Sequence, residues 1–272
     1  MTCQPFFMLA LADIMSYSED QIRDLLEDAF ERYNQSSFIE DDPIQVPHLF
    51  SKKEDIELAA YFSATIAWGR RASIIKNALS LMDRMDRAPY EFVMGAGDDE
   101  LARLDSFVHR TFNAQDARAL VLGLRDVYNH EGLEAIYAEG MKSELSTFGG
   151  IVAFHTRITS LSLFPDRSRK HIANPAKGSS AKRINMFLRW MVRKDSRGVD
   201  FGIWESIRPN QLMMPLDVHT GNVARKLGLL ERKQNDWKSV IELTERLRAF
   251  DSEDPVRFDF SLFGLGAYNQ LL

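Results

Sequence analysis

The sequence predicts an all-α fold, and two observations support that prediction. In most segments apolar residues recur three and four positions apart, which places them on one face of a helix. No segment shows a sustained alternation of apolar and polar residues, the pattern typical of a half-buried strand. With 272 residues, the chain is long enough to bury a substantial core as one large domain or as two lobes.

Local signals mark where several helices begin. Residues 18–21 and 51–54 have capping-box patterns, and the second opens a helix that is apolar nearly all round and therefore expected at the centre of the fold. Residues 38–50 contain Pro43 and Pro47, so we expect this segment to be extended. The expected helices lie at residues 19–34, 52–68, 72–85, 114–129, 132–141, 151–164, 181–192, 217–228, 235–250 and 254–270.

Composition excludes several classes of protein. Cys3 is the only cysteine, which excludes a disulfide framework and an all-cysteine zinc or iron–sulfur site within this chain. The six histidines include no pair at helical metal-binding spacing, so we expect no bound metal. No apolar run reaches the roughly 20 residues that cross a bilayer. Residues 6–12 follow no basic region, so we expect a packed helix or an over-long gene start there, and a cytoplasmic protein.

Charge is distributed unevenly along the chain. The net charge of −5 argues against a general nucleic-acid-binding protein. Residues 167–197, however, contain ten basic residues and a single acid, Asp195. Such a patch is typical of phosphate binding, and a solvated helix face is the alternative explanation. The basic residues are Arg167, Arg169, Lys170, Lys177, Lys182, Arg183, Arg189, Arg193, Lys194 and Arg197.

Lys182 begins a predicted helix directly after three small residues, 178–180. Small residues before a helix let backbone N–H groups approach a phosphate, and the helix dipole favours that anion. The same dipole disfavours the protonated form of a first-turn lysine, and a partly neutral lysine is what amine nucleophilic chemistry requires. A surface lysine that contacts only phosphate is the alternative. The expected buried stripe comprises Ile184, Phe187, Leu188, Met191 and Val192, and another face carries Lys182, Asn185, Met186, Arg189 and Arg193.

Asp217 begins the helix that ends at Gly228. Its alternative role is that of a helix N-cap, which contributes about 1 kcal/mol. A capping carboxylate can also point into a cleft, so the two roles are compatible. Together, Lys182 and Asp217 suggest an amine nucleophile and a carboxylate partner that act on a phosphate-bearing substrate.

These segments resemble the helix-hairpin-helix DNA glycosylase superfamily (HhH-GPD). AKRINMFLRWMV resembles its lysine helix, PLDVHTGNVARKLGL its aspartate segment, and FSATIAWGRRASIIKNALSLMDRM an early buried helix with the helix that follows. The glutamine that many members carry in the early turn is absent, and Gly69 lies near that position. The long spacing between Lys182 and Asp217 looks most like the archaeal 8-oxoguanine DNA glycosylase branch. The chain also looks like an uncharacterised bacterial family, the DUF2400 type, within this superfamily.

The resemblance implies a DNA base-excision repair glycosylase with AP lyase activity that removes an oxidised purine such as 8-oxoguanine. Lys182 would attack C1′ and form a Schiff base, and Asp217 would stabilise the positive sugar and assist deprotonation of the lysine. The implied partner is double-stranded DNA with a damaged base, bound by a monomer that needs no cofactor. The implied phosphate-binding residues are Lys177, Gly178, Ser179, Ser180, Arg183 and Arg189.

The resemblance also implies two helical lobes with a cleft between them. Residues 1–51 and 151–272 would form the hairpin-containing lobe, and residues 52–150 the helical barrel lobe.

Three residues are candidates for a base pocket. Asp259 would accept hydrogen bonds from a flipped purine while Phe263 stacks on it; the alternatives for Asp259 are pairing with Arg257 or a solvated edge. Trp68 would line the cleft, and core packing is its alternative. Two rival functions remain open: a non-catalytic DNA-binding protein that uses Lys182 only for phosphate contact, and a helical protein unrelated to DNA.

Overall fold

The computed structural model describes residues 17–142, 144–162 and 164–267, and it confirms the all-α prediction. Among these residues the only strands are β1 (Val108–His109) and β2 (Phe112–Asn113), which form a short antiparallel pair. The helices are α1 (Glu19–Tyr33), α2 (Ser37–Glu40), α3 (Lys53–Thr65), α4 (Arg71–Arg84), α5 (Pro89–Gly95), α6 (Asp98–Ala102), α7 (Ala114–His130), α8 (Leu133–Met141), α9 (Phe148–Thr159), α10 (Lys182–Val192), α11 (Val218–Lys226), α12 (Trp237–Arg248) and α13 (Phe258–Ala267).

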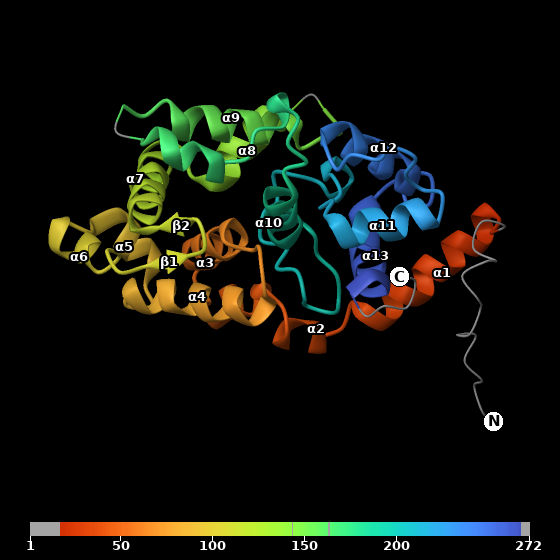
Figure 1. Cartoon of the computed structure of the whole chain (residues 1–272), viewed down its shortest axis with the longest axis horizontal. Coiled ribbons are helices and arrows are strands. Elements are labelled where there is room, and N and C mark those ends of the chain that lie inside the picture. Colours follow the sequence, from red (N-terminus) through yellow and green to blue (C-terminus); the bar gives the residue numbers. More distant parts are fainter. Residues whose placement is uncertain (1–16, 143, 163, 268–272) are drawn as a thin grey trace.

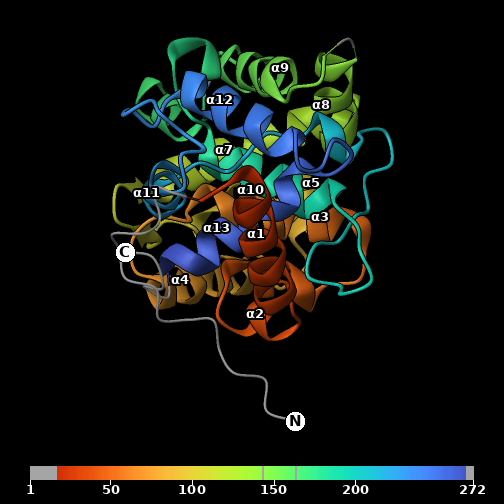
Figure 2. The same cartoon turned by 90° about the vertical axis from the view of Figure 1, so that its right-hand side faces the viewer.

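Helix α10 lies in the middle of the molecule, with α4–α9 on one side and α1, α11, α12 and α13 on the other (Figure 1). It packs against α3, and every α10 residue from Ile184 to Val192 is buried. Helices α1 and α13 pack together on the opposite side of α10 from α5 and α7 (Figure 1), and α1 lies at the front in the view turned by 90° (Figure 2). The helix that begins with Lys182 is therefore surrounded by protein along most of its length.

The capping box predicted at residues 18–21 is confirmed. The Ser18 hydroxyl accepts a hydrogen bond from the Gln21 N–H, and the Gln21 side chain accepts one from the Ser18 N–H. The capping box predicted at residue 51 is wrong, because α3 begins at Lys53 and no side chain caps it. Burial stabilises α3 instead: every residue from Ile56 to Thr65 is buried, which confirms its expected central position.

Residues 38–50 are not extended, contrary to the prediction from their prolines. Pro43 and Pro47 each begin a 3₁₀ turn, where the missing proline N–H has no energetic cost. Asp42 caps the first of these turns by accepting a hydrogen bond from the Ile44 N–H at 3.0 Å. The prolines therefore mark the starts of turns, and their effect on the preceding residue does not extend the whole segment.

The predicted boundary between residues 150 and 151 lies inside α9, so no linker separates two lobes there. Helix α9 packs on α8, whereas α1 packs on α13. The division into two lobes stays a prediction. Cys3 and the apolar residues 6–12 lie outside the described residues. None of the described helices has both the length and the apolar character needed to span a membrane.

Glycines allow α8 and α9 to approach each other closely. A Cβ atom added at Gly140 of α8 would lie 2.6 Å from the carbonyl oxygen of Gly149 in α9. A Cβ added at Gly150 would lie 2.7 Å from the carbonyl oxygen of Tyr137. The obstructing atoms belong to the backbone, so side-chain rotation cannot relieve either clash.

We predict that Gly140→Ala lowers the free energy of unfolding by about 1–3 kcal/mol, because α8 and α9 must separate to admit the methyl group. Gly95 is the matched control, since a Cβ added there meets no atom within 4 Å. Gly95→Ala should raise stability by about 0.5–1 kcal/mol through helix propensity alone. Urea unfolding of both variants measures the difference, and equal effects would refute the close helix contact.

Candidate active site

The ammonium group of Lys182 lies beside the carboxylate of Asp217. Their Nζ and Oδ2 atoms are 3.7 Å apart, and the side chains are 25% and 24% exposed. The Lys182 Nζ also lies 3.6 Å from the Sδ atom of Met186, one turn further along α10. The structure thus brings together an amine and a carboxylate from distant segments, in a position that is partly buried yet open to a ligand.

A hairpin, residues 174–181, leads into Lys182. The Asn174 side chain accepts a hydrogen bond from the Ala176 N–H at 2.9 Å, and the Gly178 N–H donates to the Pro175 carbonyl at 2.9 Å. Gly178 has a φ of 86°, a left-handed conformation that glycine adopts without strain. Ala181 is also left-handed, with a φ of 49°, and α10 starts immediately after it.

Hydrogen bonds anchor the hairpin at Gly178 and Ser180, while residues 177–179 stay exposed. The Trp237 N–H donates to the Gly178 carbonyl at 3.2 Å, and the Asn185 amide donates to the Ser180 carbonyl at 3.2 Å. Lys177, Gly178 and Ser179 are exposed, and Ser180 is half-buried. The predicted phosphate-binding residues 177–180 are therefore held on a fixed turn that a ligand can reach.

Asp217 is the N-cap of α11 and also the neighbour of Lys182. Its Oδ1 accepts a hydrogen bond from the Thr220 N–H at 2.9 Å, while Oδ2 is the atom nearest to Lys182. The Asn235 amide donates to the Asp217 carbonyl at 3.0 Å. The capping hydrogen bond fixes the carboxylate, so the two roles considered for Asp217 occur together.

Arg189 does not share the exposure of Lys182, so the expectation of a common basic face is wrong. It is 3% exposed, and its guanidinium forms ion pairs with Asp200, at 3.2 Å, and with Asp259. The guanidinium also lies 4.2 Å from the ring centre of Phe260. Arg189 is therefore not available to bind phosphate.

Arg193 is buried in the same way. Its guanidinium reaches Asp254 and Asp195 at 2.8 Å each, and Asp200 at 3.2 Å. The face of α10 that the sequence pattern assigned to basic residues is thus covered by protein. Pairing with aspartates makes that burial possible.

The basic run at residues 167–197 does not form one continuous surface patch, because many of its arginines form ion pairs with aspartate or glutamate side chains. Lys170, Lys177 and Lys194 are exposed, and none of them forms an ion pair with a described residue. The exposed basic surface is therefore smaller than the sequence suggested. Further ion pairs in this run are Arg167 with Asp116 at 2.7 Å, Arg169 with Asp166 at 2.9 Å, and Arg197 with Glu31 at 2.5 Å.

Arg183 and Trp68 contact each other beside the site. The Arg183 guanidinium lies 4.9 Å from the Trp68 ring centre and donates a hydrogen bond to the Thr65 carbonyl. Burial lowers the pKa of Arg183. The half-buried Trp68 ring also stacks on His171, with 5.8 Å between ring centres. These contacts already occupy Arg183, which was expected to bind phosphate, and Trp68 packs against both Arg183 and His171.

Asp259 is buried near the Lys182–Asp217 pair. Burial raises the pKa of Asp259 to about 6; the charges of Arg189 and Lys182 oppose this rise, and that of Asp217 adds to it. Asp259 is thus close enough to the Lys182–Asp217 pair to interact with it electrostatically. Its partner is Arg189, whereas Arg257 pairs with Glu27 and Asp251.

Phe263 lies one turn beyond Asp259 on α13. Its ring is 5.3 Å from the Arg71 guanidinium and 6.1 Å from the Phe38 ring centre. Sequence reasoning did not identify Arg71 as a neighbour of Phe263, because their contact depends on tertiary packing.

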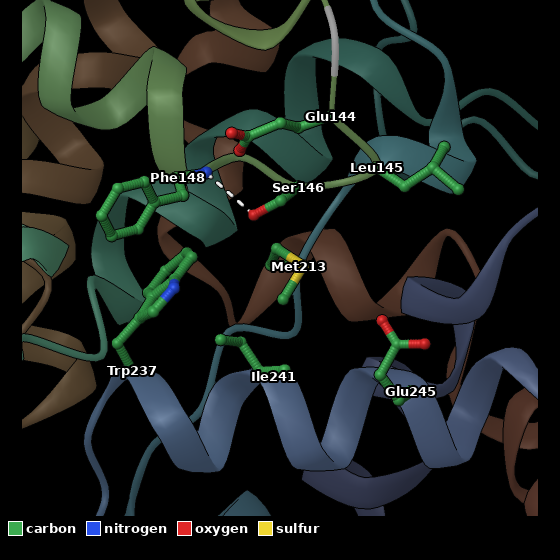
Figure 3. Close-up of a pocket in the computed structure, with 8 residues that line it drawn as sticks. All are labelled: Glu144, Leu145, Ser146, Phe148, Met213, Trp237, Ile241 and Glu245. Atoms are coloured by element: carbon green, nitrogen blue, oxygen red, sulfur yellow. Dashed lines mark hydrogen bonds between the residues drawn. The ribbon is translucent and has the colours of Figure 1, made fainter.

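A separate groove of about 350 Å³ lies along α12 (Figure 3). Phe148 and Trp237 form one end of it, with 5.6 Å between their ring centres. Neither Lys182 nor Asp217 lines this groove. The described residues contain no group of three or more histidine, cysteine or acidic side chains placed to hold a metal ion. The groove is lined by Glu144, Leu145, Ser146, Phe148, Met213, Trp237, Ile241 and Glu245.

In a comparison with known protein families, a family model described as "Protein of unknown function (DUF2400)" matches residues 42–268. No curated protein matches the chain, and no solved structure matches it. The assignment to the helix-hairpin-helix DNA glycosylase superfamily, and to its archaeal branch, is therefore wrong, because the matched family is a different one. That resemblance relied on three separate segments, and helices with similar starts occur in unrelated helical proteins.

We predict that Arg189→Met lowers the free energy of unfolding by about 3–5 kcal/mol, because it leaves Asp259 buried without its cation and removes one of the two arginines that pair with Asp200. Arg169→Met is the matched control: its pair with Asp166 is exposed, so the loss should stay below about 1 kcal/mol. Denaturant unfolding measures both. A small effect at residue 189 would show that its charge is not needed inside the fold.

Proposed function

Because this chain belongs to the DUF2400 family of proteins of unknown function, we propose its function from its site: a DNA base-excision repair glycosylase with AP lyase activity that removes an oxidised purine. The observation that carries the proposal is the 3.7 Å contact between Lys182 and Asp217 beside an exposed hairpin. A partly exposed amine next to a fixed carboxylate suits covalent attack on a sugar carbon.

In the proposed reaction the neutral Lys182 amine attacks C1′ of the damaged nucleotide. The N–C1′ bond forms as the glycosidic bond breaks, and the base leaves with the bonding electrons and takes up a proton. Opening of the sugar ring gives a Schiff base. Loss of a C2′ proton then expels the 3′ phosphate by β-elimination, and water hydrolyses the imine to release the lysine.

Asp217 contributes charge at the reacting carbon. Its carboxylate opposes the positive charge that develops on the sugar, and it assists removal of the proton from Lys182. The hydrogen bond from the Thr220 N–H fixes the carboxylate before the substrate binds. The carboxylate therefore needs little reorganisation during the reaction.

The hairpin supplies the phosphate contacts in this proposal. Lys177 is exposed in the hairpin, and the first backbone N–H groups of a helix favour an anion. The target base must leave the duplex for its C1′ to reach the lysine, which costs a few kcal/mol. We propose a monomer in the cytoplasm, with double-stranded DNA containing a damaged base as its partner. Arg183 and Arg189 are left out of the phosphate contacts because other groups occupy them.

We predict that borohydride traps a covalent adduct between this protein and DNA that contains 8-oxoguanine or an abasic site. Lys182→Gln should abolish the adduct, because an amide cannot form an imine. Asp217→Asn should slow trapping by about 10²–10⁴-fold while leaving stability nearly unchanged, because asparagine also caps helices well. Gel analysis measures the yield of trapped complex for the wild type and for both variants. Binding without any adduct would instead favour a non-catalytic DNA-binding protein.

We predict that Lys177→Gln weakens duplex DNA binding and reduces the slope of log K against log salt by about 0.9, the loss of one phosphate contact. Lys142→Gln is the control, because Lys142 is exposed and pairs with Glu139 at the end of α8. Fluorescence anisotropy from 50 to about 200 mM salt measures both slopes. Affinity that does not depend on salt in the wild type would support a protein unrelated to DNA.

A further inference from the structure

The turn between β1 and β2 carries an exposed cation that the site described above does not use. Side chains alternate along this turn: Val108 and Arg110 are exposed, whereas His109 between them is buried. Val108 is 61% exposed, which is unusual for a large apolar side chain of this protein. The turn therefore presents both a positive charge and an apolar group to solvent.

His109 fixes this turn to the rest of the molecule. Its Nδ1 lies 2.8 Å from the side-chain nitrogen of Asn77 in α4, and its Nε2 lies 3.0 Å from the Trp68 carbonyl oxygen. An amide nitrogen only donates, so Nδ1 accepts that hydrogen bond and Nε2 donates to the carbonyl. The His109 and Trp68 rings also meet edge to face, with 5.0 Å between their centres. These contacts hold the turn beside α4 (Figure 1).

Arg110 lies directly over Gly69. A Cβ atom added at Gly69 would lie 2.9 Å from Nη1 of Arg110 and 3.2 Å from its Cδ. Gly69 has a φ of 105°, a conformation that a glycine adopts without strain. The absence of a side chain at residue 69 thus lets the guanidinium approach the backbone of the turn that leads into α4. Arg70 follows Gly69 in that turn.

Both arginines lack an acidic partner. Arg70 and Arg110 are exposed, and neither forms an ion pair with a described residue. The sequence contains no acid at residues 58–82, and the one acid at residues 103–113, Asp105, already pairs with another arginine at 2.7 Å. The two guanidinium groups therefore differ from the buried arginines of α10, whose donors are used within the protein.

Trp68 connects this surface with the start of α10. Its ring contacts His109, and the Arg183 guanidinium lies 4.9 Å from its centre. Arg183 follows Lys182 directly in the chain. Duplex DNA carries one phosphate charge per about 1.7 Å of its axis, so a duplex that places a nucleotide at Lys182 also presents phosphates to the surface around it.

We propose that Arg70 and Arg110 bind phosphates of the DNA backbone and form a second contact surface in addition to the hairpin. The inference rests on the proposed function, which supplies the DNA. A planar guanidinium donates two parallel hydrogen bonds to a phosphate, so arginine suits this contact. The DNA backbone alternates phosphates with sugars, and the exposed Val108 offers an apolar contact for a sugar next to them.

The salt dependence of binding to an undamaged DNA duplex tests the proposal without requiring catalysis. Arg70→Gln and Arg110→Gln should each reduce the slope of log K against log salt by about 0.9, and the double variant by about 1.8. Arg110→Lys keeps the charge and should retain the wild-type slope, which distinguishes a phosphate contact from a structural role. Fluorescence anisotropy measures the affinities.

Arg87→Gln is the matched control. Arg87 is exposed and has a φ of 53°, close to the 55° of Arg110, but its guanidinium pairs with Asp83 at 2.8 Å. This variant loses the same charge from the same backbone conformation and should keep the wild-type slope. Thermal unfolding verifies that each variant is folded. If one glutamine variant does not fold, the other completes the test, because the two arginines lie on different elements.

Wild-type slopes in both glutamine variants would overturn the proposal. An equal reduction in Arg87→Gln would attribute the effect to net charge and would overturn it too. A reduced slope in Arg110→Lys would assign that residue a structural role and remove it from the contact surface. Displacement of the duplex from the wild type by inorganic phosphate at constant ionic strength would identify a site for a free anion, which also contradicts the proposal.

Borohydride trapping on abasic DNA separates this proposal from the proposed function. If the wild type forms the adduct while the glutamine variants keep the wild-type slope, the second surface fails and the lyase proposal stands. If the variants reduce the slope and the wild type forms no adduct, the lyase proposal fails and the contact surface stands. A wild type that does not bind DNA overturns both.

Discussion

Burial of positive charge on α10 is the constraint on which the arrangement of this molecule depends. Arg189 and Arg193 lie at the centre of the fold, and a guanidinium there is tolerated only with close anionic partners. Those partners come from residues 195–200 and from the segment that starts α13. Helix α13 in turn packs on α11, whose first turn is capped by Asp217. The charge pairing therefore connects the helix that carries Lys182 to the helix that carries its carboxylate neighbour.

Helix positions were largely predictable because their determinants are local. The capping box at residues 18–21 and the N-cap at residue 217 each involve groups within three positions of one another. The surroundings of α10 were not predictable, since Arg189 pairs with residues 11 and 70 positions away. In most helices a face that carries arginines is exposed to solvent. In α10 that face is buried, and its arginines pair with aspartates.

Local signals also located Lys182 and Asp217, because both follow recognisable helix starts. They did not reveal the burial of Asp42, which caps the turn that begins at Pro43. The prolines at 43 and 47 favoured an extended segment, and the 3₁₀ turns that they begin instead bring the carboxylate inward. Family resemblance misled for a related reason: short segments with the right residue types do not define a common fold.

The anchoring of the hairpin has a consequence for how any ligand is accommodated. A backbone hydrogen bond joins residue 178 to α12, and the Asn185 side chain joins residue 180 to the buried helix. A turn held in this way is preorganised, so binding there demands little loss of chain entropy from the protein. The partner molecule must then change its own conformation to make contact, so affinity should be higher for a more flexible partner.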